Sequence, residues 1–145
     1  MRVPNPRILS LALAVCCLVP AAPAQPQRWK DTCCPHYDVE KELTVAGVVE
    51  SVRRDRGHTR VWMTHLVVNV DGEAMDLLLG PSRFVSSRQP RIREGDTIEA
   101  ACAPLDTPLE SSPYAKQLVV RQVKVGDHVL AFRNESGKPV WGLSL

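Results

Sequence analysis

The sequence predicts an all-β protein with a single small domain. Three features support this prediction. Apolar and polar residues alternate in several short segments, turn residues separate these segments, and no long amphipathic helical pattern occurs. Alternation with a period of two is typical of strands that bury one face in a core. With 145 residues, the chain is long enough to bury such a core without metal ions or disulfides.

The first 24 residues predict a signal peptide. Residues 1–7 carry two arginines and no acid, and residues 8–19 are almost continuously apolar. Ala22-Pro23-Ala24 then provides small residues for a signal peptidase, so cleavage is expected before Gln25. We therefore expect a periplasmic or secreted protein.

The expected mature chain has balanced charge. Arg2 and Arg7 leave with the signal peptide, so 16 Lys and Arg face 16 Asp and Glu. A net charge of zero provides no general attraction to nucleic acid or to anionic lipid. No second apolar stretch of membrane length follows, so no transmembrane segment is expected after cleavage.

The cysteines leave the disulfide pattern open. Lipidation of Cys16 is disfavoured, because bulky Val15 stands where lipoprotein signals have a small residue. Cys33, Cys34 and Cys102 remain after cleavage, an odd number for an oxidising compartment. One disulfide is possible, either between the adjacent pair or between one of them and Cys102.

The first strand follows a polar, proline-containing N-terminal arm at residues 25–42. It begins at Leu43, and its apolar positions have two steps of two and one of three: Val45, Gly47, Val49 and Val52. This spacing predicts a bulge or strong bend, where a glycine removes the obstructing side chain. Residues 53–59 are charged and contain a glycine, so a loop is expected there.

A hairpin is expected next, from a strand at 61–70, a turn at Asp71-Gly72 and a return strand at 73–79. The core face of the first of these strands would hold Trp62, Thr64, Leu66, Val68 and Val70. The outer face would hold Met63, His65, Val67 and Asn69, so His65 is expected to be exposed.

The remaining elements complete the pattern. Residues 81–87 predict a short helix with Pro81 as its first residue and Phe84 as its core anchor. Strands are expected at 97–103 and 116–125, with a proline-bearing loop at 105–113 between them, and a terminal hairpin at 129–141. Together these elements predict a five-stranded OB-fold-like barrel over 43–145, with the helix between the third and fourth strands. A small β-sandwich is the alternative, because periodicity does not fix strand order.

Several short motifs resemble an exported bacterial family of small OB-fold-like domains, most of them without a known activity. These motifs are Val45-x-Gly47-x-Val49, Leu79-Gly80-Pro81, Glu94-Gly95-Asp96 and the tail Leu130-x-x-Arg133-x-x-x-Gly137-x-Pro139-x-Trp141. The family is similar to OB-like domains of magnetosome-associated proteins, and the resemblance covers about residues 37–141. It implies an exported barrel and assigns no activity. Cys102 and the Cys33-Cys34 pair depart from the family pattern.

The preferred functional hypothesis is a non-catalytic binding or accessory module. In an OB barrel the first inter-strand loop flanks the usual ligand groove. That loop would present Arg53, Arg54, Arg56 and Arg60, with His65 nearby, to a partner protein or a small anionic ligand. No catalytic motif occurs, so no enzymatic activity is expected.

Two alternatives remain. Cys33-Cys34-Pro35-His36, together with Cys102, could supply soft ligands to a metal-handling or redox protein. This spacing matches no zinc pattern, so no metal or other cofactor is expected. An oligonucleotide- or oligosaccharide-binding OB fold is the other alternative. Nucleic acid is disfavoured, because the outer face of the second and third strands has no aromatic residue for base stacking.

Overall fold

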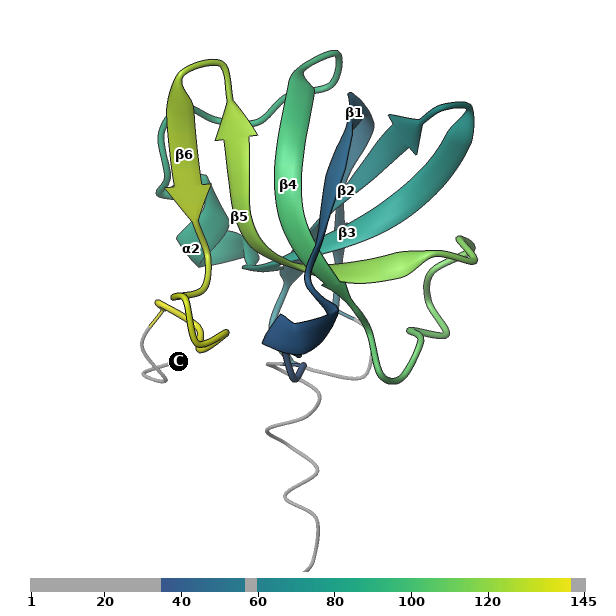
Figure 1. Cartoon of the computed structure of the whole chain (residues 1–145), viewed down its shortest axis with the longest axis vertical. Helices are drawn as coiled ribbons and strands as arrows, with labels where there is room; N and C mark the ends of the chain where they lie inside the picture. The colour runs from purple at the N-terminus through teal and green to yellow at the C-terminus, as the bar shows by residue number, and fades with distance from the viewer. Residues whose placement is uncertain (1–34, 57–59, 142–145) are drawn as a thin grey trace, which may run out of the picture.

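The computed structural model describes residues 35–56 and 60–141, and over this part the protein is a small β-barrel (Figure 1). A 3-10 helix η1 and an α-helix α2 accompany six strands. Their bounds are η1 Val39–Lys41, β1 Leu43–Asp55, β2 Met63–Val70, β3 Glu73–Pro81, α2 Ser82–Ser86, β4 Thr97–Pro104, β5 Gln117–Val125 and β6 His128–Ala131.

Five of the strands close into a ring. The order in the sheet is β3-β2-β1-β4-β5-β6, and a parallel pairing between β3 and β5 joins its two ends. The other pairings are antiparallel. This is the connectivity of a Greek-key barrel with a helix between the third and fourth strands. The predicted five-stranded OB-fold-like barrel is therefore confirmed. In Figure 1 the strands fan from β6 on the left to β2 and β3 on the right.

Gly47 permits the bend by which β1 serves two neighbours. The first half of β1 pairs with β4 and the second half with β2, with a register shift between Val49 and Ser51. A Cβ atom at Gly47 would lie 2.2 Å from the backbone oxygen of Asn69 on β2. No side chain fits at that distance, so the predicted bend and its glycine are both confirmed.

The predicted turn and helix are also present. Asp71 and Gly72 have φ angles of 51° and 88°, as a tight two-residue hairpin turn requires, and Val70 pairs with Glu73 across it. α2 lies within the predicted segment 81–87.

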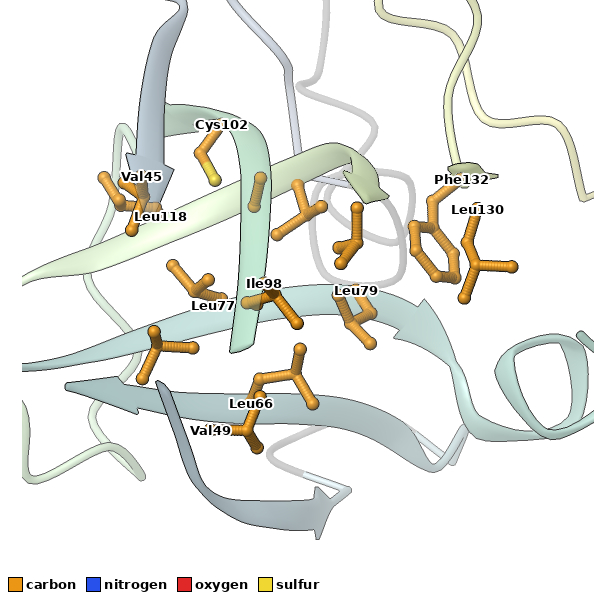
Figure 2. Packing of buried hydrophobic residues seen from close by; sticks show 14 of the residues in the cluster. Val45, Val49, Leu66, Leu77, Leu79, Ile98, Cys102, Leu118, Leu130 and Phe132 are labelled. Atoms are coloured by element: carbon orange, nitrogen blue, oxygen red, sulfur yellow. The ribbon is translucent and has the colours of Figure 1, made fainter. Parts of the chain in front are cut away.

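The barrel interior is filled by apolar side chains from every strand. Figure 2 shows Val49, Leu66, Leu77 and Ile98 converging on the centre, and all four are almost fully buried. Trp141 closes this core near α2. Its indole packs so tightly on Gly80 that a Cβ atom there would come within 2.8 Å of the ring.

Two sequence-based assignments of elements were wrong. β1 continues to Asp55, so Arg53 and Arg54 belong to a strand and not to a loop. Trp62 precedes β2 and is 53% exposed, so it is not a core residue. The predicted terminal hairpin is present in a short form: Arg133 and Pro139 form a bridge, and the Val140 backbone nitrogen donates to the carbonyl oxygen of Phe132 at 3.1 Å.

The outer face of β2 also differs from the prediction. Met63, His65 and Val67 are buried, with exposed fractions of 6%, 4% and 1%. Alternation had assigned these residues to an exposed face. The periodicity correctly indicated that they face away from the barrel core, but it could not show that other parts of the protein cover them.

The predicted signal peptide, Cys16 and the Cys33-Cys34 pair lie outside the described residues. The described end of the N-terminal arm packs on the barrel through Tyr37, which is buried with Ala103 and Val119 in a second apolar cluster. Among residues 35–56 and 60–141, no helix is long and apolar enough to cross a membrane.

Candidate functional site

A groove of about 700 Å³ lies where the end of β1 meets α2. We call it the basic groove. It is lined by the end of β1, the segment before β2, the end of β3 and α2: Arg54, Arg60, Val61, Trp62, Pro81, Ser82, Arg83 and Ser86. Its volume is within the range of small-molecule sites, about 300–1,000 Å³.

Three arginines give the groove its charge. Arg54, Arg60 and Arg83 are exposed, and in the described part of the chain none of them forms an ion pair. Arg53 and Arg121 differ, because each lies close to a carboxylate. Arg121, for example, binds both carboxylate oxygens of Glu42 at 2.6 and 2.7 Å. Three cations without an acidic partner produce a positive potential that favours an anion in the groove.

Hydrogen bonds fix the two walls of the groove relative to each other. The backbone nitrogen of Ser82 donates to the carbonyl oxygen of Trp62 at 2.7 Å, and the hydroxyl of Thr64 donates to that of Ser82 at 2.8 Å. These bonds join the segment before β2 to the start of α2. Because Ser82 and Thr64 are both buried, the bonds are shielded from water and hold the walls in place.

Trp62 adds a large apolar surface to the same groove. Its side chain is 53% exposed, and the guanidinium of Arg56 lies over its ring at 5.5 Å from the centroid. A cation over an indole face is favourable and orders the ring. The groove therefore combines positive charge with an aromatic surface.

A second polar cluster lies on the outer face of β1, β2 and β3, and is centred on Asp76. His65 Nδ1 is 2.9 Å from Asp76 Oδ1, and the Ser112 hydroxyl donates to Asp76 Oδ2. Arg53 Nη1 lies 3.6 Å from the same Oδ2, and the Arg53 guanidinium lies 5.8 Å from the centre of the Tyr114 ring. The exposed fraction of Asp76 is only 2%, so these groups compensate a buried charge.

The neighbours of Asp76 keep its carboxyl group ionised. Burial alone would raise the pKa of Asp76. The hydrogen bond and charge of His65, the hydroxyl of Ser112 and the charge of Arg53 outweigh burial, and the pKa of Asp76 is below its ordinary value. The hydroxyl proton of Ser112 points to Asp76 and not to His65. The three side chains therefore lack the serine-to-histidine contact of a nucleophile and its base.

The Asp76 cluster holds the segment 105–116 against the barrel. Besides Ser112, this segment supplies the carbonyl oxygen of Lys116, which accepts from the Asp76 backbone nitrogen at 2.9 Å. The side chain of Gln117 bonds to the backbone of Leu109 and Tyr114 and so folds the segment on itself. The face of β2 and β3 is where OB folds usually bind ligands. Here Ser112 from this segment reaches onto that face.

Of the candidate metal ligands, the structure describes His36 and Cys102, and these two do not form a metal site. Cys102 is a free thiol with 0% exposure, and Figure 2 shows its sulfur inside the core near Val45 and Leu118. Burial, with a smaller effect from Glu42, raises the pKa of Cys102 to about 12. His36 is exposed. Within residues 35–56 and 60–141, no group of three or more His, Cys, Asp or Glu side chains could hold a metal ion.

The five predicted site residues separate into three places. Arg54 and Arg60 line the basic groove, and Arg56 lies on the ring of Trp62. Arg53 and His65 instead belong to the Asp76 cluster, because successive residues of a strand point to opposite faces. His65 was predicted to be exposed, and this was wrong.

Two contributors to the groove, Arg83 and Trp62, were not predicted. Arg83 lies 23 positions after Arg60 in the chain, and only the folding of α2 brings it to the groove. A signal was available for Trp62. It lies two positions after Arg60, close to the charged loop, so it could have been assigned to that loop.

Comparison with known proteins gave one match. The sequence profile of the MamS/MamX magnetosome protein family matches residues 41–130. This span contains the whole basic groove and the Asp76 cluster. No curated protein and no solved structure matched the chain.

Proposed function

Because this chain belongs to the MamS/MamX magnetosome protein family, we propose that it is an exported, magnetosome-associated accessory protein that binds an anionic group. The bound group is a small anion or an anionic part of a partner protein, and it occupies the basic groove. The observation that carries this proposal is the convergence of Arg54, Arg60 and Arg83, without acidic partners in the described structure, around about 700 Å³.

The proposed role is binding and not catalysis. Of the polar side chains that could do chemistry, His65 and Asp76 are buried and Ser112 is half-buried, and both His65 and Ser112 are engaged with the Asp76 carboxylate. In the basic groove, the hydroxyl of Ser86 donates to the carbonyl oxygen of Ser82 at 2.6 Å, and among the residues that the structure describes no histidine or acid lines the groove. Arginine side chains stay protonated, so they bind anions without exchanging protons with them.

The structure favours this proposal over both alternatives. Of the cysteines in the metal-handling alternative, Cys102 lies among the described residues, and its thiol is neutral, buried and surrounded by apolar side chains, which disfavours it as a metal ligand. Oligonucleotide binding on an OB barrel uses the face of β2 and β3. On that face His65, Val67 and Asp76 are buried, so they offer no open surface for stacked bases.

The experiment is a titration of the purified protein with inorganic pyrophosphate, at low salt, followed by NMR. We expect chemical-shift changes at residues 54, 60–62 and 82–86, and binding that weakens as salt screens the charges. The variant Arg54→Ala/Arg60→Ala/Arg83→Ala should lose at least tenfold in affinity, because it removes all three unpaired cations.

The matched control is Arg93→Ala. Arg93 is also exposed and lies before β4, but it does not line the groove. It should bind pyrophosphate as the wild type does. The proposal is wrong if the wild-type protein does not bind the anion, or if the triple variant binds it equally well.

A further inference from the structure

We propose that the ligand of the basic groove joins a planar ring to a phosphate or similar oxyanion. The ring would stack on Trp62, and the oxyanion would lie among Arg54, Arg60 and Arg83. This inference rests on the proposed function and specifies the class of ligand. A nucleoside monophosphate has both parts in one small molecule.

The position of Trp62 is the first argument. Large aromatic residues usually bury their area in the core, as Trp141 does with an exposed fraction of 6%. Trp62 instead leaves half of its side chain in solvent and contributes nothing to either apolar cluster. An exposed indole in a groove is a surface that a flat apolar group can cover.

The rigidity of the Trp62 backbone is the second argument. Its carbonyl oxygen accepts the hydrogen bond from the Ser82 backbone nitrogen, and Arg56 packs over its ring. A platform held in this way loses little conformational freedom when a ligand stacks on it. The guanidinium of Arg56 already stacks on the indole of Trp62, so a ligand ring on the same indole would lengthen this stack.

The arrangement of the cations is the third argument. The three arginines come from β1, from the segment before β2 and from α2, so three separate segments of the chain bring cations to the groove. A phosphate offers several oxygens in different directions, and arginine matches these oxygens with its planar fork of donors. A single carboxylate has fewer oxygens to share among three guanidinium groups.

The number of aromatic residues limits the size of the ligand. Within the described part of the chain, Trp62 is the one aromatic side chain that lines the groove, and single-stranded nucleic acids bind to several stacking residues in succession. The outer face of β2 and β3, where such a strand would continue, is buried at His65 and Val67. A single ring with an attached anion therefore fits better than a polymer.

The test compares four probes by isothermal titration calorimetry: adenosine monophosphate, ribose 5-phosphate, adenosine and pyrophosphate. We expect adenosine monophosphate to bind about tenfold more tightly than ribose 5-phosphate, which is the effect of one base–aromatic stack. Adenosine alone should bind weakly, because it lacks the anion.

Variants of Trp62 test the stack directly. Trp62→Ala should remove the preference for adenosine monophosphate over ribose 5-phosphate. Trp62→Phe should retain part of the preference, because phenylalanine preserves a stacking face. Circular dichroism of each variant checks that the barrel is folded, and Arg93→Ala again serves as the surface control.

The outcomes separate this inference from the proposed function. If pyrophosphate binds but the ring adds no affinity, or if Trp62→Ala keeps the preference, the inference is wrong and the anion site stands. If no phosphate compound binds, the proposed function fails as well. If adenosine binds as tightly as its monophosphate, the groove recognises the ring without the anion, and the inference is again wrong.

Discussion

At the scale of single residues, Asp76 determines the chemistry of the outer face. It is an ionised carboxylate with 2% exposure, and three side chains from different segments compensate its charge. A buried charge without such partners would cost several kcal/mol. The hydrogen-bonding network therefore stabilises the fold only while Asp76 is ionised.

This dependence on ionisation predicts a pH effect. The pKa of Asp76 is lowered in the folded protein. Its contribution to the free energy of unfolding is therefore fully present above the pKa of an unfolded aspartate, about 3.9. This contribution is lost as the pH falls from that value through the lower pKa of folded Asp76. At pH 7, Asp76→Asn should unfold with a free energy about 2 kcal/mol lower than the wild type. Urea unfolding should show this difference shrinking below pH 4. A difference independent of pH would contradict the assignment.

Sequence could predict some of these residue roles and not others. Gly47 was predictable, because a glycine within an alternating pattern marks a bend, and the close approach to Asn69 confirms it. The role of Asp76 was not. An acid in an alternating segment looks the same whether water or Ser112 covers it, and Ser112 is 36 positions away.

At the scale of elements, the segment 105–116 bonds to the outer face of the barrel at Asp76. Its prolines predicted a loop correctly, and the structure shows that it is anchored at both ends. Leu105 donates to Gln117, and Lys116 accepts from Asp76 through its carbonyl oxygen. A loop held in this way is an ordered part of the surface and not a free connection.

The anchoring by Ser112 can be tested by hydrogen exchange. Ser112→Ala removes the bond to Asp76, so backbone amides in 105–116 should exchange at least fivefold faster, while those of β4 stay protected. Ser136→Ala is the control, because its hydroxyl bonds only locally to Asn134. Unchanged exchange in 105–116 would show that the segment is held by other contacts.

At the scale of the whole molecule, Arg133 joins the two ends of the described chain. Its guanidinium donates to the carbonyl oxygens of Gly137 at 2.9 Å and Pro35 at 3.0 Å. It also lies over the rings of Tyr37 and Trp141, at 5.8 and 5.5 Å from their centres. With an exposed fraction of 3%, this arginine acts as an internal connector.

Replacing Arg133 should therefore destabilise the entire barrel. Arg133→Met keeps much of the apolar stem but removes the donor from the carbonyl oxygens of buried Gly137 and half-buried Pro35, which should lower the free energy of unfolding by about 2–4 kcal/mol. Arg93→Met is the control and should have little effect, because Arg93 is exposed. Urea denaturation measures both. Equal stability of the two variants would refute the connector role.

The sequence by itself determined most of the strands, the bend at Gly47 and the Asp71-Gly72 turn, because these depend on local periodicity and backbone conformation. The pairing of β3 with β5 decided between the predicted barrel and the alternative β-sandwich. The sequence also placed Arg54 and Arg60 in the candidate site. Only the tertiary structure decided that Trp62 and Arg83 share that site and that His65 is buried. These features depend on contacts between segments far apart in the chain, and no local pattern encodes which segment will cover a given face.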